Sequence, residues 1–276
     1  MLLAINANNT NVKFGLFEGD RMVGDWRLRT DSGRTADEYL VWLSQLLSIA
    51  GIDRRQIKES IIATVVPQAL LHLRMLCEKH LGTKPLIVGD PGVKLGIKVL
   101  LDRPNEVGAD RLANAVGGHL ICPEPLVIVD FGTATTFDVV DGEGNYTGGV
   151  ISPGINLSLE ALHGATAMLP RIAVAPTQRV IGKNTLEAMQ SGIFWGYVGL
   201  IEGLVARIQK EFGGPLAVIA TGGLAPLFVD ATPVIRRLEP EITMRGLVEI
   251  HRRNTHTGRS KPIGHQPLGR NKPKAR

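Results

Sequence analysis

The sequence predicts an α/β protein made of two similar halves that face each other across a central cleft. Of its 276 residues, 44% are hydrophobic and 32 are glycine, which suits a large core with many tight turns. The stretches LLAINANNTNVKFGLFEGD and LVIVDFGTATTFDVVDGEG share one strand–turn–strand plan and lie 124 residues apart. A repeat of this length indicates duplication of a domain rather than a short repeat array. We expect halves at 1–120 and 121–253 and a basic, disordered tail at 254–276.

In the first half, apolar runs predict strands at 2–6, 12–17 and 22–30, joined by polar turns. Residues 35–50 have apolar side chains at helical spacing, and Thr35 with Glu38 forms a capping box, so a helix is predicted there. The other elements expected here are a strand at 60–66, a helix at 67–81, a strand at 85–88 and a helix at 105–120.

The second half repeats this order. Strands are predicted at 126–130, 136–141 and 146–152, and Pro153-Gly154 introduces a helix that extends to about residue 169. The remaining elements expected are a long amphipathic helix at about 184–212, a strand at 216–221 and a last helix near 240–252.

The composition excludes several classes of protein. No apolar run approaches the roughly 20 residues that span a bilayer, and the first residues read as a strand rather than a signal peptide. We therefore expect no membrane partner. Cys77 and Cys122 are too few and too far apart for a disulfide framework or a zinc site. We interpret them as buried free thiols, which fits a cytoplasmic protein.

The net charge of +5 comes from the end of the chain. Residues 251–276 hold eight Lys or Arg and no acid, and the rest of the chain has 23 bases against 26 acids. A mildly acidic body argues against a nucleic-acid partner. The basic tail is predicted to be a solvated extension, with binding to RNA, DNA or acidic surfaces as a minor alternative.

The two turns that follow the leading strands have the composition of phosphate-binding turns. Residues 8–11 are Asn-Asn-Thr-Asn and residues 132–135 are Gly-Thr-Ala-Thr. A turn between paired strands directs backbone N–H groups one way, and small or amide side chains let an anion approach. Each turn alone is more simply an ordinary turn. Two copies at equivalent points of a duplication favour a nucleotide, and Asp130 at the end of its strand could hold a cation. Neither a Walker loop nor a Rossmann fingerprint is present.

Asp110 and Arg111 supply what transfer of a phosphoryl group to an alcohol requires. Such a reaction uses a carboxylate that accepts the hydroxyl proton, and an adjacent arginine can bind an anionic group of the substrate. An acid near a helix start can also serve only as a partner of the helix dipole.

These motifs resemble the type III pantothenate kinases, members of the superfamily of actin, Hsp70 and the sugar kinases. The resemblance covers about residues 1–250. It rests on NxxNTNxxFGLF (6–17), PxEVGADR (104–111), DFGTATTFD (130–138), GGVISPGI (148–155), GKNT with AMQSG (182–192) and TGG (221–223). It implies duplicated ribonuclease H-like, actin-like ATPase halves and an enzyme that phosphorylates pantothenate with ATP, the first step towards coenzyme A.

The resemblance also implies roles for individual residues. Asp110 would be the general base, Asp130 would bind a monovalent cation, K+ or NH4+, and Mg2+ would enter with ATP. Pantothenate would contact Gly108, Ala109, Asp110 and Arg111. Thr185 would reach the site of the neighbouring subunit in a homodimer. The residues implied for ATP are Asn6, Ala7, Asn8, Asn9, Thr10, Asn11, Val12, Lys13, Thr133, Gly222 and Gly223.

The first turn departs from the family pattern, which usually reads Asp-x-Gly-Asn-Thr. Here Asn6 replaces the aspartate and Asn8 replaces the glycine. An amide oxygen can ligate magnesium but brings no charge, so we expect weaker affinity for magnesium or ATP. Leu101 stands where the family often has a tyrosine that contacts the substrate.

Three functions follow from these residues. The first is an active pantothenate kinase. The second is a non-catalytic nucleotide- or pantothenate-binding regulator, which Asn6 favours, although the retained Asp110, Arg111, Asp130 and Thr133 count against it. The third is a related kinase that acts on another hydroxyl substrate.

Overall fold

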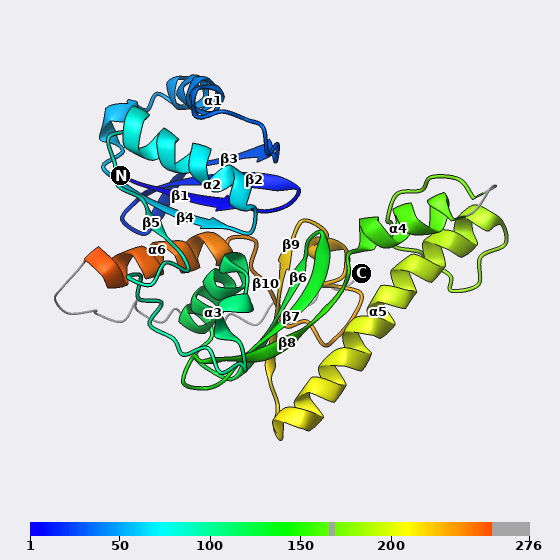
Figure 1. Ribbon diagram of the computed structural model, residues 1–276. Coiled ribbons are helices and arrows are strands. Elements are labelled where there is room, and N and C mark those ends of the chain that lie inside the picture. Colours follow the sequence, from blue (N-terminus) through cyan, green and yellow to red (C-terminus); the bar gives the residue numbers. More distant parts are fainter. Residues whose placement is uncertain (166–168, 256–276) are drawn as a thin grey trace.

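The computed structural model describes residues 1–165 and 169–255 and contains two five-stranded sheets, with two helices packed between them. Figure 1 shows the first sheet and its outer helices above, and the second sheet below with a long helix that projects to one side.

The first sheet has the strand order β3-β2-β1-β4-β5. Strand β1 is antiparallel to β2 and parallel to β4, and β2 is antiparallel to β3. Alternate residues of β1 and β2 point to an outer core with helices α1 and α2, because side chains of a strand alternate between its faces. The bounds are β1 Leu2–Ala7, β2 Asn11–Glu18, β3 Arg21–Arg29, α1 Ala36–Ile49, β4 Glu59–Thr64, α2 Pro67–Met75 with a π-helical turn Leu76–His80, and β5 Leu86–Ile87.

The second sheet repeats this topology with the order β10-β9-β6-β7-β8. Strand β6 is antiparallel to β7 and parallel to β9, as β1 is to β2 and β4, so the predicted duplication is confirmed. Helix α5 packs on the outer face, and its amino end projects away from both sheets together with α4 (Figure 1). The bounds are β6 Leu126–Phe131, β7 Ala134–Val140, β8 Tyr146–Pro153, α4 Ile155–Gly164, α5 Thr185–Phe212, β9 Ala217–Gly222 and β10 Arg237–Leu238.

Helices α3 (Ala109–Ile121) and α6 (Ile242–Thr255) lie between the two sheets (Figure 1). Met244, Leu247 and Ile250 of α6 pack with residues of β1 and β4, whereas Ile242 packs with Leu126 and other residues of the second sheet. The last helix therefore returns to the first sheet, although its sequence belongs to the second half. Burial of this apolar surface fixes the two sheets relative to each other.

Several elements differ from the sequence prediction. The segment expected to open the helix at 105–120 is a 3-10 turn, Pro104–Glu106, and α3 begins only at Ala109. The strand β10 was not predicted, because two residues are too few to show the alternation of apolar and polar side chains that indicates a strand. Helix α6 ends at Thr255 rather than near 252, so the first two residues of the predicted tail are helical. Helix α4 ends at Gly164, short of the predicted end near residue 169. Residues 166–168 and the rest of the tail, 256–276, lie outside the described residues. The domain limits themselves stay a prediction.

The two turns also differ in length. The pair Ala7↔Val12 encloses four residues, whereas Phe131↔Thr135 encloses three. Counted back from the second strand of each hairpin, Thr133 is equivalent to Thr10.

The remaining findings concern thiols and the membrane. Cys77 is buried and Cys122 is half-buried, and both are free thiols.

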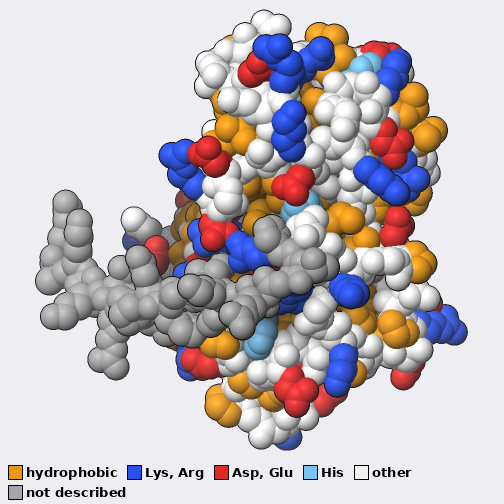
Figure 2. Space-filling view, turned by 90° about the vertical axis from the view of Figure 1, so that its left-hand side faces the viewer, with side chains coloured by type: hydrophobic (Ala, Val, Ile, Leu, Met, Phe, Trp, Pro, Cys, Tyr) orange, Lys and Arg blue, Asp and Glu red, His pale blue; other side chains and the backbone are white. Residues whose placement is uncertain are grey.

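Within the described residues, no helix is both long and apolar enough to cross a bilayer. On the face shown in Figure 2, Lys and Arg side chains are interspersed with Asp and Glu, which differs from the basic stripe typical of nucleic-acid binding.

Candidate active site

The two polar turns meet where β1 and β6 end. The hydroxyl Oγ1 of Thr10 lies 2.6 Å from Oγ1 of Thr133, so a hydrogen bond joins the turns across the two halves. Inside the first turn the Asn8 N–H donates to Asn11 O at 2.9 Å, and the Thr30 hydroxyl donates to Asn8 O at 2.6 Å. The carboxyl ends of both leading strands therefore open into one place, which is where ligands of α/β proteins commonly bind.

Buried amide oxygens without partners mark the first turn. Asn6 is 5% exposed, and its Oδ1 has no hydrogen-bond partner among the described residues. The same holds for Oδ1 of Asn8. A buried polar atom without a partner costs free energy unless water or a ligand satisfies it. Both oxygens have the chemistry to face a cation or an ordered water around a nucleotide.

The other residues implied for ATP in this turn divide into two groups. The side chains of Ala7 and Val12 lie in the outer core, so only their backbone could contact a ligand. Lys13 pairs with Asn6 in the β1–β2 register, and its Nζ lies 3.5 Å from Asp25 Oδ2. Lys13 is therefore tied to a carboxylate of β3 in this structure.

Asp110 lies in the first turn of α3, where the amide dipoles of the helix favour a negative charge. The backbone N–H of Arg111 donates to Asp110 Oδ1 at 2.8 Å. Burial raises the pKa of Asp110, and the hydrogen bond from the Arg111 N–H and the Arg111 charge oppose this in part. A carboxylate with a raised pKa accepts a proton more readily than an ordinary aspartate, which suits a general base.

Asp130 lies one residue before the end of β6 and is held by Asn114 of α3, which Thr243 of α6 supports in turn. Asn114 Nδ2 donates to Asp130 Oδ2 at 3.0 Å, and the Thr243 hydroxyl donates to Asn114 Oδ1 at 2.6 Å. Burial raises the pKa of Asp130 to about 7; the hydrogen bond from Asn114 lowers it in part, and the like charges of Asp110 and Asp138 add to the rise. A cation beside Asp130 would relieve this repulsion.

Arg111 points into the hairpin of β7 and β8. Its Nε donates to Asp138 Oδ1 at 2.6 Å, and Tyr146 Oη donates to the same oxygen at 2.8 Å. The guanidinium lies over the Tyr146 ring, with 5.7 Å between Cζ and the ring centroid. Leu101 packs in the same cluster as Tyr146.

The structure brings most predicted residues together but not all. Gly222 has φ +94, and a Cβ there would lie 2.7 Å from Asp130 Oδ1. A glycine at this position therefore lets the backbone of β9 lie close to the end of β6. Gly223 faces open space. Thr185 starts α5, and Figure 1 shows the amino end of this helix well away from the meeting point of the turns.

Sequence reasoning missed Asn114, Thr243, Tyr146 and the role of Asp138. Asp138 ends the motif DFGTATTFD, but spacing across a turn does not show which face of the sheet a side chain takes. In the structure both carboxylates contact α3, Asp130 through Asn114 and Asp138 through Arg111. Asn114 is a polar residue on the buried face of α3, and its position among apolar residues is the feature that could have marked it as functional.

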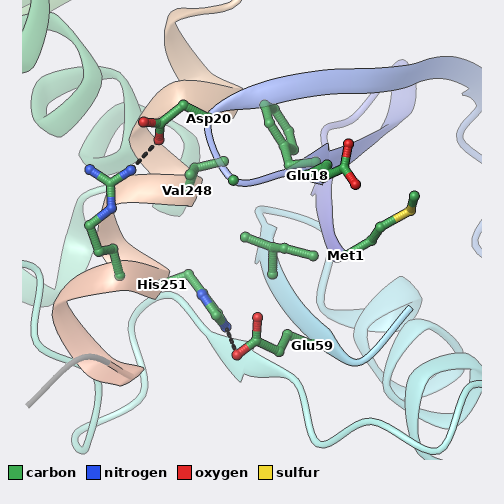
Figure 3. A pocket seen from close by; sticks show the side chains of 10 residues that line it. Met1, Glu18, Asp20, Glu59, Val248 and His251 are labelled. Carbon is green, nitrogen blue, oxygen red and sulfur yellow. Dashed lines mark hydrogen bonds and ion pairs between the residues drawn. The ribbon is translucent and has the colours of Figure 1, made fainter. Parts of the chain in front are cut away.

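A separate pocket lies at the opposite end of the first sheet, where β1 begins (Figure 3). Arg252 forms an ion pair with Asp20 across it, and His251 Nε2 lies 3.9 Å from Glu59 Oε1. None of the predicted site residues lines it. Among the described residues, no group of three His, Cys, Asp or Glu could hold a metal ion by itself, so any cation at the turns would share its ligands with the nucleotide or backbone.

Comparison with known proteins identifies close sequence relatives. The type III pantothenate kinase family model matches residues 2–207. The type III pantothenate kinase of Paramagnetospirillum magneticum is 61% identical over 255 residues, which cover 92% of this chain and 98% of that protein. The type III pantothenate kinase of Rhodospirillum rubrum is 58% identical over 254 residues, covering 92% and 99%.

Solved structures share the fold at low sequence identity. The activator of 2-hydroxyisocaproyl-CoA dehydratase from Clostridium difficile, with bound ADPNP, has a TM-score of 0.55 at 12% identity and covers 94% of this chain and 99% of its own. Component A of (R)-2-hydroxyglutaryl-CoA dehydratase from Acidaminococcus fermentans has a TM-score of 0.53 at 14% identity, covering 90% and 94%. Together with the repeated sheet topology, these likenesses confirm the predicted actin-like ATPase fold.

Proposed function

Because this chain belongs to the type III pantothenate kinase family, we propose that the meeting point of its two turns is the active site of a pantothenate kinase. The enzyme phosphorylates pantothenate with ATP in coenzyme A biosynthesis. The family match does not favour a non-catalytic regulator. The observation that carries the assignment of the site is the junction of the turns through Thr10 and Thr133, with Asp110 close enough to Asp130 to affect its pKa.

Asp110 is the general base in this proposal. Its carboxylate accepts the proton of the primary hydroxyl of pantothenate while that oxygen forms a bond to the γ-phosphorus of ATP. The bond between the γ-phosphorus and the bridging oxygen breaks, and ADP leaves with that oxygen. Because such transition states are loose, positioning and electrostatics supply most of the acceleration. The place of Asp110 at the start of α3 positions its carboxylate, and burial of the carboxylate strengthens its electrostatic effect.

The two turns hold the phosphates of ATP. In the first turn these are residues 6–13, and in the second Thr133 contacts the nucleotide. Two unpaired amide oxygens, of Asn6 and Asn8, fit the magnesium ion that accompanies ATP. Magnesium would neutralise charge on the phosphates when bound. Gly222 and Gly223 follow β9 at the same edge of the second sheet and would lie beside the adenosine; open space around Gly223 supports this.

Pantothenate lies against the start of α3 in this proposal. Gly108 and Ala109 provide backbone there, Asp110 meets the hydroxyl, and Arg111 meets the carboxylate. The half-buried guanidinium of Arg111, which is 17% exposed, supports this placement. The kinase could instead act on another hydroxyl substrate, and the assay below separates the two.

Asp130 is the proposed site of a monovalent cation, K+ or NH4+. A half-buried carboxylate that two like charges disfavour is poorly stable alone, and its Oδ2 already accepts from Asn114. A cation at Oδ1 would keep Asp130 ionised at neutral pH. The cation would also offset phosphate charge at the adjacent turn.

The enzyme is proposed to act as a homodimer through α5. Gly192, Gly196, Gly199 and Gly203 recur at intervals of four, three and four, so they share one helix face. A Cβ at the first three would meet no described atom within 4 Å. Such a face lets a second helix approach closely. A dimer would also explain how Thr185, remote from the turns of its own chain, serves a site: the partner's Thr185 would contact pantothenate.

We place the enzyme in the cytoplasm, without a nucleic-acid partner. Its substrate ATP is made there, and the free thiols Cys77 and Cys122 suit a reducing compartment.

A coupled assay for ADP, with ATP, Mg2+ and K+ and with or without pantothenate, tests the function. We expect ADP release to require pantothenate and the product to be 4'-phosphopantothenate by mass. Measurable pantothenate binding without turnover would contradict the enzyme assignment. Turnover with another hydroxyl compound at higher kcat/KM would instead support the alternative substrate.

A further inference from the structure

The Arg111 side chain is fixed by groups that neither bind nucleotide nor accept the hydroxyl proton. Asp138 is fully buried, and its Oδ1 accepts from both Arg111 Nε and Tyr146 Oη. The Thr136 hydroxyl lies 3.3 Å from Asp138 Oδ2 and donates to it. The guanidinium also lies over the Tyr146 ring. Asp138 and Thr136 belong to β7 and Tyr146 to β8, so the two strands of this hairpin together hold the arginine.

The backbone of β8 is shaped to admit the arginine. Gly149 pairs with Asp138 in the β7–β8 register, so it lies directly across from the carboxylate. A Cβ at Gly149 would lie 2.8 Å from Arg111 Nη2 and 2.2 Å from the backbone oxygen of Phe137. Only glycine leaves this room.

The pairing leaves one edge of the guanidinium for a ligand. Asp138 accepts from Nε, and among the described residues no hydrogen bond from either Nη atom is formed. A guanidinium presents a second pair of N–H groups that match a carboxylate. Because Asp138 and Tyr146 hold the plane of the group, little rotamer freedom would be lost when a carboxylate binds.

We propose that Asp138 and Tyr146 are positioning residues that hold Arg111 as the reader of the substrate carboxylate, and so make the enzyme select an anionic over a neutral pantothenate analogue. The proposal rests on the proposed function. It adds that discrimination at the carboxylate end depends on the β7–β8 hairpin. A buried ion pair can also serve only the fold, and this alternative predicts a different result.

The test compares pantothenate with pantothenyl alcohol, in which a hydroxymethyl group replaces the carboxylate. For wild type, Asp138→Asn and Tyr146→Phe, KM and kcat are measured with each compound, and Ki replaces KM where the alcohol turns over too slowly. We expect KM for pantothenate to rise about 10-fold or more in Asp138→Asn and about 3-fold in Tyr146→Phe, because charge-assisted hydrogen bonds are weakened. KM for ATP, kcat at saturation and the constant for the alcohol should change less than about 2-fold.

Thr147→Val is the matched control, because the Thr147 hydroxyl donates to Val139 O in the same hairpin at 3.2 Å and does not contact Arg111. It should leave all constants unchanged. Equal losses with both compounds, or no change in KM for pantothenate, would overturn the proposal. If Asp138→Asn does not fold, Tyr146→Phe, which removes one hydroxyl, decides alone. Absence of pantothenate phosphorylation by wild type would contradict the proposed function instead, so the two failures are distinct.

Discussion

Replacement of Asp110 by asparagine should stop proton transfer while it leaves the binding site in place. Asparagine has nearly the same shape, and its Oδ1 can still accept the Arg111 N–H that now lies 2.8 Å from Asp110 Oδ1. The side chain also keeps its position at the start of α3. What it loses is the ability to take the hydroxyl proton.

The expected loss follows from what a positioned base contributes. General base catalysis typically accelerates a reaction about 10²- to 10⁴-fold, which corresponds to roughly 3–5 kcal/mol of activation free energy. We therefore expect kcat of Asp110→Asn to fall by at least about 10²-fold, while the Kd for pantothenate changes less than about 3-fold. Single-turnover rates and isothermal titration with pantothenate measure the two quantities separately.

The pKa of Asp110 gives this prediction a second measurement. Burial raises that pKa, and the base works only when ionised, so kcat/KM of wild type should fall as the pH drops through a value above that of ordinary aspartate. For an acid whose pKa is raised by folding, the ionised form lowers stability; this cost is fully present above the folded-state pKa, declines as the pH falls below it and is gone below the unfolded-state pKa. Asp110→Asn removes the cost, so its melting temperature at pH 8 should equal or exceed that of wild type.

Glu106→Gln is the control, because Glu106 is exposed and lies just before α3; among the residues that the structure describes, its carboxylate pairs with Arg103 alone, at 3.0 Å. It should keep full activity. The reasoning would be refuted if Asp110→Asn lost less than about 10-fold in kcat, or if the Kd for pantothenate rose in parallel with the loss of kcat.

Three further outcomes are expected. Asn6→Asp should lower the KM for MgATP at least about 3-fold, because a carboxylate binds magnesium more strongly than the unpaired amide oxygen present now; an unchanged KM in steady-state kinetics would show that residue 6 does not face the metal. Asp130→Asn should abolish the stimulation of initial rates by K+ relative to tetramethylammonium; stimulation that persists would show that the cation does not bind at Asp130. Gly196→Leu should shift the protein from dimer to monomer in sedimentation velocity, because the added side chain occupies space that is open beside α5; a dimer of unchanged stability would place the interface elsewhere. The same variant should lose activity, since each site would lack the partner's Thr185.

Much of the fold could be predicted from local sequence. The strands of both halves are apolar runs bounded by polar turns, and the helix at α1 carries a capping box that the structure retains. The prediction was wrong where the signal was short or depended on distant contacts. Strand β10 has two residues and exists because it pairs with β9, and the 3-10 turn before α3 looks helical in sequence.

The candidate site shows the same division. Asp110, Arg111, Asp130 and Thr133 stand in recognisable motifs, so the sequence alone singled them out as candidates. Asn114 supports Asp130, and Thr243, 129 residues further along the chain, supports Asn114; no local pattern indicates such contacts.

The two turns were visible as a repeat in the sequence, since duplicated strands keep the same alternation of apolar and polar residues. The sequence also determined the chemical groups at each turn, including the amide at residue 6. Only the tertiary structure decided that the turns touch through Thr10 and Thr133 and that Asp138 engages Arg111. These relations depend on how α3 and α6 pack between the sheets, and packing is a property of contacts between distant residues rather than of any one segment.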